Sequence, residues 1–140
     1  MFARTLSLLL AVASGCVILV DDEWAAWTWN WDPVVYDGDA GCVWDSALRE
    51  NVWYFEAEVD DWDGPEDIWF VEANVYDEWR GGRLVDAFEL APTEDPWIWY
   101  GEWMEFSTAL DCRYTGYSVD LIAWDFYEGW GVLTLTPRTR

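Results

Sequence analysis

The sequence predicts an all-β fold, an antiparallel β-sandwich of about seven strands. Three observations indicate it. Apolar and polar residues alternate with a period of two in several segments, which places the apolar side chains of an extended chain on one face. Turn-forming residues such as Gly81-Gly82 separate these segments at regular intervals. Between residues 33 and 137 the sequence shows no convincing periodicity of a long amphipathic helix.

The first part of the domain contains two predicted strands. Residues 34–36 form a short apolar strand, and residues 37–41, Asp-Gly-Asp-Ala-Gly, have turn chemistry. The pattern of residues 43–51 is ambiguous and indicates neither a strand nor a long helix, and one helical turn is expected around Ala47. The second strand, residues 52–59, has the clearest alternation and one apolar face, which consists of Trp53, Phe55, Ala57 and Val59.

A hairpin is predicted in the middle of the domain. Residues 60–65, Asp-Asp-Trp-Asp-Gly-Pro, end the second strand, and residues 68–77 form the third. Gly81-Gly82 lies between two arginines and is a strong signal for a two-residue hairpin turn, so residues 84–90 return antiparallel. The alternation in the third strand predicts one shared face for Trp69, Val71, Ala73 and Val75.

Three further strands are predicted after this hairpin. Residues 97–106 are extended and aromatic, with an interruption expected at Gly101. Residues 117–125 alternate and place Tyr117, Val119, Leu121 and Ala123 on one face. Glu128-Gly129 then turns the chain into the last strand, residues 131–136.

The N-terminal residues have the organisation of an export signal. Arg4 is followed by an apolar stretch and by the small residues Ala13-Ser14-Gly15. With Cys16 behind them, these residues resemble the lipobox of bacterial lipoproteins. The resemblance implies a signal peptide in residues 1–15 and a lipid, such as palmitate, on Cys16. Ordinary secretion and an uncleaved anchor are the alternatives, although the 15 residues from 6 to 20 are fewer than the roughly 20 of a spanning helix.

Residues 16–32 are interpreted as a tether with an aromatic segment, and residues 33–140 as the folded domain. Trp27, Trp29 and Trp31 repeat every second residue, so an extended chain places them on one face. That face either packs on the domain or is presented for contact.

Cysteine parity predicts one disulfide. If Cys16 carries lipid, Cys42 and Cys112 are left as a pair in an oxidising compartment. Strands that alternate in direction place the first-to-second and fifth-to-sixth connections at the same end of the fold, and these connections hold the two cysteines. The alternative is two buried thiols that do not meet.

The composition excludes several classes of function. The chain has 28 acidic and seven basic residues, a formal net charge of −21 and no histidine or lysine. Such a charge repels nucleic acid and attracts metal cations and basic partners. The usual catalytic bases and nucleophiles are missing, so we expect no enzyme. Because 53% of the residues are hydrophobic and 14 are tryptophan, the chain is not disordered.

Two segments resemble a known family. Residues 58–68, Glu-Val-Asp-Asp-Trp-Asp-Gly-Pro-Glu-Asp-Ile, look like the second strand, loop and third strand of bacterial immunoglobulin-like or fibronectin-type-III-like modules. Residues 123–131, Ala-Trp-Asp-Phe-Tyr-Glu-Gly-Trp-Gly, resemble the last hairpin of these modules. The resemblance covers residues 33–137 and implies an immunoglobulin-like β-sandwich. The cysteines depart from the antibody pattern, because Cys42 and Cys112 precede the second and sixth strands instead of lying within them.

A candidate calcium site follows from the same alternation of strand direction. It places the second-to-third and sixth-to-seventh connections together at the end opposite the cysteines. Calcium takes six to eight oxygen ligands, and Asp-x-Asp-Gly supplies two carboxylates and a glycine suited to a turn. The candidate ligands are Asp61, Asp63, Asp67 and Asp125. The alternative is a solvated acidic rim, since the full EF-hand register is missing.

Together these observations predict a lipid-anchored, non-enzymatic structural or interaction module of the bacterial cell envelope. Val17 follows the lipid cysteine where an aspartate would resemble an inner-membrane signal, so the outer membrane is favoured. The expected partners are the membrane, through the lipid, and a protein or glycan, with no nucleic acid. No cofactor is required, and calcium is the one ion considered. The alternatives are a calcium-stabilised adhesion-type domain and carbohydrate binding by exposed aromatic residues such as Trp62 and Trp124.

Overall fold

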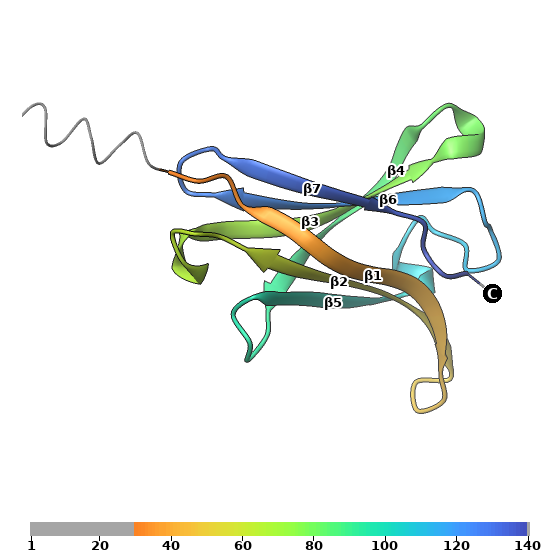
Figure 1. The fold of residues 1–140 in the computed structure, drawn as a ribbon. Coiled ribbons are helices and arrows are strands. Elements are labelled where there is room, and N and C mark those ends of the chain that lie inside the picture. Colours follow the sequence, from red (N-terminus) through yellow and green to blue (C-terminus); the bar gives the residue numbers. More distant parts are fainter. Residues whose placement is uncertain (1–29, 140) are drawn as a thin grey trace, which may run out of the picture. The chain divides into compact units, whose positions relative to one another are not determined.

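The structure, a computed structural model, describes residues 30–139. The predicted signal peptide, the lipid on Cys16, and Trp27 and Trp29 lie outside the described residues. The described chain consists of seven antiparallel strands with short 3-10 turns between them, which confirms the all-β antiparallel prediction (Figure 1). The strands are β1 (Val34–Asp45), β2 (Glu50–Asp60), β3 (Ile68–Asp77), β4 (Arg83–Pro92), β5 (Ile98–Met104), β6 (Tyr117–Asp125) and β7 (Trp130–Leu135). The 3-10 turns are η1 (Pro65–Asp67), η2 (Glu78–Arg80) and η3 (Glu105–Ser107).

The strands form one continuous sheet in the order β1-β2-β5-β4-β3-β6-β7. It has two halves, β1-β2-β5 and β4-β3-β6-β7, which are joined by only two residue pairs between β4 and β5. The sheet also curls until its edges meet. The backbone N–H of Cys42 donates to Arg138 O at 2.9 Å, and the N–H of Arg138 donates to Ala40 O at 2.9 Å. The folded sheet therefore encloses a single core.

Aromatic rings fill the centre of this core. Phe55 stacks on Phe88 with ring centroids 4.9 Å apart, and Trp103 packs against both. The prediction that Gly101 interrupts the strand is wrong, because β5 is continuous there. A Cβ on Gly101 would stand 2.3 Å from the Trp103 ring, so the glycine makes room for that ring. Alternating positions of three strands line the core as predicted: Trp53, Phe55, Ala57 and Val59 of β2, Val71, Ala73 and Val75 of β3, and Tyr117, Val119, Leu121 and Ala123 of β6.

The first strand is longer than predicted. Residues 37–41 do not turn but continue β1. A Cβ on Gly38 would meet Leu121 Cδ1 at 2.3 Å, so this glycine permits close packing against β6. The helical turn expected around Ala47 is also wrong, because residues 46–49 form the tight turn of the β1–β2 hairpin. Asp45 Oδ1 holds this turn by accepting the backbone N–H of Ala47 at 2.7 Å.

Trp69 does not share the buried face of β3, contrary to the predicted alternation. The pairing of β3 with β6 shifts between Ile68, which lies opposite Asp125, and Phe70, which lies opposite Trp124. Trp69 is the extra residue of a β-bulge, and a bulge reverses the side on which a side chain points. The Trp69 side chain is therefore on the outer face, 59% exposed.

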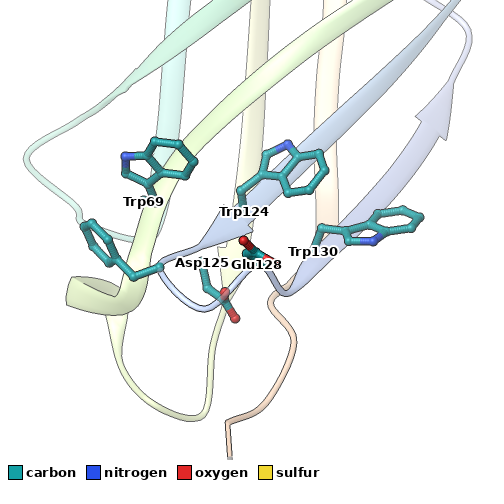
Figure 2. A pocket seen from close by; sticks show the side chains of 6 residues that line it. Trp69, Trp124, Asp125, Glu128 and Trp130 are labelled. Carbon is teal, nitrogen blue, oxygen red and sulfur yellow. The ribbon is translucent and has the colours of Figure 1, made fainter.

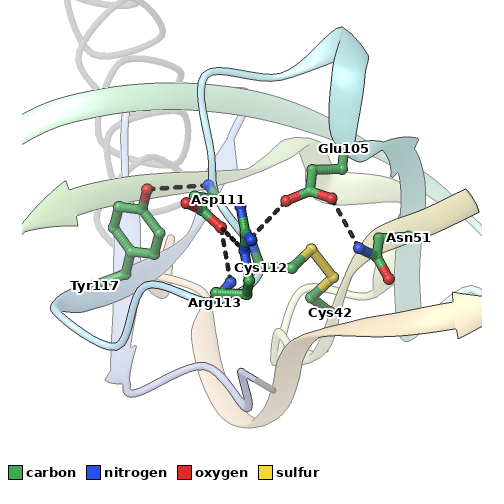
Figure 3. A network of polar contacts seen from close by, with 7 residues as sticks. All are labelled: Cys42, Asn51, Glu105, Asp111, Cys112, Arg113 and Tyr117. Atoms are coloured by element: carbon green, nitrogen blue, oxygen red, sulfur yellow. Dashed lines mark hydrogen bonds and ion pairs between the residues drawn. A yellow bond between two sulfur atoms is a disulfide. The ribbon is translucent and has the colours of Figure 1, made fainter.

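The predicted Cys42–Cys112 disulfide is present (Figure 3). Both cysteines are buried, and their Cα atoms are 5.6 Å apart. Cys42 lies inside β1 and not in the connection that follows it, because β1 is longer than expected. Glu105 supports the bridge, since its carboxylate accepts the backbone N–H of Cys112 and the side-chain amide of Asn51, each at 2.8 Å. The bridge fastens the segment between η3 and β6 to β1.

Candidate metal centre

Three carboxylates meet where the β2–β3 connection approaches the β6–β7 turn. Asp61 follows β2 directly, Asp67 ends η1, and Asp125 ends β6. One oxygen of each lies within 4.8 Å of the others. The structure thus brings together three of the four residues named from the sequence. We call Asp61, Asp67 and Asp125 the acidic cluster.

The β2–β3 connection folds so that Asp67 returns to Asp61. Asp61 Oδ1 accepts the backbone N–H of Asp63 at 2.8 Å, and its carbonyl oxygen accepts the N–H of Gly64 at 3.0 Å. Gly64 has φ 107°, a conformation that glycine adopts without steric cost. Pro65 then begins η1, as its fixed φ favours, and one turn later Asp67 faces Asp61.

The β6–β7 turn is built around Asp125. Its Oδ1 accepts the backbone N–H groups of Tyr127 and Gly129, each at 2.7 Å. The N–H of Phe126 donates to Asp67 O at 3.2 Å, which ties this turn to the β2–β3 connection. Asp125 is 1% exposed, so its carboxylate is part of the protein interior.

Asp63, the fourth residue named from the sequence, lies outside the acidic cluster. Its Oδ2 accepts the backbone N–H of Trp31 at 2.8 Å. The Trp31 ring in turn packs against Trp62, with centroids 6.1 Å apart. Asp63 therefore holds the segment that leads into β1, and Trp62 at the tip of the connection is 84% exposed, as its loop position predicted.

Asp32 is a neighbour of the acidic cluster that sequence reasoning missed. A Cβ on Gly129 would stand 2.3 Å from Asp125 Oδ2 and 2.6 Å from Asp32 Oδ1, so both carboxylates point to the same place. Asp32 is there because the start of β1 runs against β7: a Cβ on Gly131 would be 2.0 Å from Pro33 O. No local pattern signals this contact between the two edges of the sheet.

The acidic cluster gathers three carboxylates in a largely buried place. Asp61 is only 3% exposed, and the buried Oδ2 atoms of Asp61 and Asp67 have no hydrogen-bond partner. Burial raises the pKa of Asp61, and the charges of Asp67, Asp63 and Asp125 raise it further, against a backbone hydrogen bond from Asp63 that lowers it. Burial likewise raises the pKa of Asp67, together with Asp125, Asp63 and Glu66. The ion pairs within residues 30–139 lie elsewhere, at Asp39, Asp77 and Asp111.

No family model, curated protein or solved structure matches this chain. Within residues 30–139, no helix is long and apolar enough to cross a membrane.

Proposed function

We propose that this chain is a non-enzymatic, calcium-stabilised module of the bacterial cell envelope, attached to a membrane by a lipid on Cys16. The observation that supports it best is the acidic cluster with its two unpaired, buried carboxylate oxygens. A buried charge without a partner is costly, and native proteins rarely leave one uncompensated. A bound cation would offset the charge of the carboxylates and take both oxygens as ligands.

Calcium suits this donor set better than zinc does. The cluster offers only oxygen, and calcium takes six to eight oxygens from carboxylates, backbone carbonyls and water in flexible geometry. Zinc prefers histidine nitrogen or thiolate. The chain has no histidine, and Cys42 and Cys112 are bonded to each other.

A structural or interaction role fits a module that is fastened at both ends. The disulfide joins β1 to the segment before β6, and an ion in the acidic cluster would join the β2–β3 connection to the β6–β7 turn. The strand groups β1-β2-β5 and β4-β3-β6-β7 support an immunoglobulin-like arrangement, for which such a role is common. With a net charge of −21, the module favours basic partners and repels nucleic acid.

Calcium is expected to raise the melting temperature of the chelator-treated protein. A ligand that binds only the folded state stabilises it by about 2.7 kcal/mol at a free concentration 100 times its Kd, which for a domain of this size corresponds to roughly 10 °C. Thermal unfolding followed by circular dichroism, in chelator and in a series of calcium concentrations, measures this shift. Sodium chloride at matched ionic strength is the control, because general screening would act equally in both salts. An unchanged melting temperature at 10 mM calcium would contradict the proposal.

The lipid anchor predicts the mass of the mature protein. When the full sequence is produced in a bacterium that processes lipoproteins, the membrane fraction is expected to contain residues 16–140 with an acylated N-terminal Cys16. Mass spectrometry of the intact protein and of its N-terminal peptide measures this directly. A Cys16→Ser variant is the matched control and is expected to lose the lipid. An unmodified Cys16 in the wild-type protein, or an uncut leader, would disprove the anchor.

A further inference from the structure

Aromatic side chains form a row across the outer face of β3, β6 and β7. Phe70 lies opposite Trp124 in the β3–β6 pairing, and Trp124 lies opposite Trp130 in the β6–β7 pairing. The ring centroids of both pairs are about 6 Å apart, at 6.0 and 6.1 Å. Trp69 extends the row, packed edge-on against Phe70 at 4.8 Å, and Phe126 follows at 6.5 Å from Trp69.

The row borders a groove of about 780 Å³ that opens to solvent beside the β6–β7 turn (Figure 2). Its volume is that of a small-molecule site. Trp69, Phe126 and Trp130 are each more than half exposed, so their rings are available to a ligand. We call it the aromatic groove; its lining consists of Trp69, Trp124, Asp125, Phe126, Glu128 and Trp130.

Two local departures from regular structure build this groove. The β-bulge turns Trp69 outward, and without it the ring would face the core. Glu128 has φ 69°, a left-handed conformation that costs a non-glycine residue about 1 kcal/mol or more. Glu128 lines the groove together with Trp124 and Trp130 (Figure 2). The indole N–H of Trp124 donates to Glu72 Oε1 at 3.2 Å, which fixes the orientation of the central ring.

The lining side chains carry negative charge and no positive charge. Four aromatic rings present electron-rich faces, and the two other residues are carboxylates. No basic, hydroxyl or amide side chain is among the six lining residues. A sugar needs donors as well as acceptors for its hydroxyl groups, and this lining offers it indole N–H groups alone. A cation that donates no hydrogen bond needs only ring faces and a counter-charge.

We propose that the aromatic groove binds an organic cation, specifically a quaternary ammonium group such as that of choline, with Glu128 as the counter-ion. The proposal goes beyond the calcium site and is independent of it, although Asp125 borders both. Asp125 Oδ1 accepts two backbone N–H groups of its own turn and Asp125 is almost fully buried, whereas Glu128 is exposed, so Glu128 is the carboxylate that a groove ligand meets. The net charge of −21 adds long-range attraction for a cation.

Titration of the purified protein with choline tests the proposal by calorimetry and tryptophan fluorescence. The critical comparison is with 3,3-dimethylbutan-1-ol, which has the shape of choline without its charge. Choline is expected to bind at least about tenfold more tightly, because both ligands gain apolar contact with the rings but only the cation gains cation–π attraction and the charge of Glu128. Phosphocholine is expected to bind more weakly than choline, since its phosphate meets the acidic surface; the reverse order would still support a quaternary ammonium site and would identify a lipid headgroup as the source of that group.

Three variants locate the binding. Glu128→Gln is expected to lower choline affinity about fivefold to tenfold and to leave the neutral analogue unchanged. Trp130→Leu is expected to weaken both ligands. Trp44→Leu, which removes a half-exposed tryptophan of β1 outside the groove, is expected to change neither. Near-ultraviolet circular dichroism checks the fold of each variant, and Glu128→Gln keeps the test valid if Trp130→Leu does not fold.

Several outcomes would overturn the proposal. They are equal binding of choline and its neutral analogue, no effect of Glu128→Gln, or tighter binding of methyl glucoside than of choline, which would indicate a sugar site. All titrations are done in chelator and again in calcium. Choline binding in chelator supports the groove even if calcium never binds, and calcium stabilisation without choline binding leaves the metal proposal standing and ends this one.

Discussion

Replacing Cys42 and Cys112 together by alanine is expected to lower the free energy of unfolding by about 4 kcal/mol. The bridge joins residues 70 apart in the sequence, and a link of that length removes a large part of the conformational freedom of the unfolded chain. Both cysteines are buried in the core, so the variant also loses packing at β1. Denaturant unfolding at equilibrium, compared between the wild-type protein and the double variant, measures the difference.

Reduction provides the matched control for this prediction. Dithiothreitol is expected to destabilise the wild-type protein by a similar amount and to leave the alanine variant unchanged. A loss of less than about 1 kcal/mol in the variant would mean that the bridge contributes little beyond the packing of two small side chains, against the chain-entropy argument.

Replacing Asp67 by asparagine is expected to have opposite effects with and without calcium. In chelator the variant should be more stable than wild type by roughly 1 kcal/mol, because the amide removes a charge that is disfavoured by burial and by its neighbours. In calcium the variant should be less stable than wild type, because it has lost a charged ligand of the ion. The order of the two melting temperatures is therefore expected to reverse: the variant melts higher than wild type in chelator and lower than wild type in calcium.

The pH dependence of the calcium-free protein follows from the same residues. The pKa values of Asp61 and Asp67 are raised above the usual 3.8, so the folded chain binds protons more tightly than the unfolded chain. Stability in chelator should therefore fall as the pH rises from about 3.8 through the raised values. The loss of stability with rising pH should be smaller in Asp67→Asn, because the variant has lost one of the two carboxyl groups with a raised pKa.

Asp60→Asn is the matched control for Asp67→Asn. Asp60 is exposed at the end of β2 and lies outside the acidic cluster. The Asp60→Asn substitution therefore removes the same charge from the same part of the fold without changing the cluster. Calcium is expected to stabilise Asp60→Asn as much as wild type. If calcium stabilised Asp67→Asn equally well, the ion would bind elsewhere on the acidic surface and the cluster would not be its site.

The features predicted correctly for β2 and β6 depend on the residue pattern within each strand. β2 and β6 have one buried face each, so their period-2 patterns fix both their extent and their orientation. Two features that depend on how one strand packs or pairs with another were missed. Gly38 looks like a turn residue until β6 is packed against it, and the bulge that turns Trp69 outward exists only in the pairing of β3 with β6.

The candidate site shows the same division. Asp61, Asp67 and Asp125 could be grouped because strand direction alone places their two connections at one end of the fold. Asp32 could not be grouped with them, because it reaches Asp125 only through the approach of β1 to β7, the two edges of the sheet. The aromatic groove was invisible for a similar reason, since Trp69 joins the row only after the bulge.

The hydrogen bond from Trp31 to Asp63 has a mechanical consequence. A pull on the N-terminal side of the domain loads the hydrogen bond between the Trp31 backbone and Asp63, which lies in the β2–β3 connection two residues after Asp61. That connection is the one a cation would rigidify. If calcium occupies the acidic cluster as proposed, it would stiffen the connection that holds Trp31, and the load at which the start of β1 detaches is expected to rise with calcium.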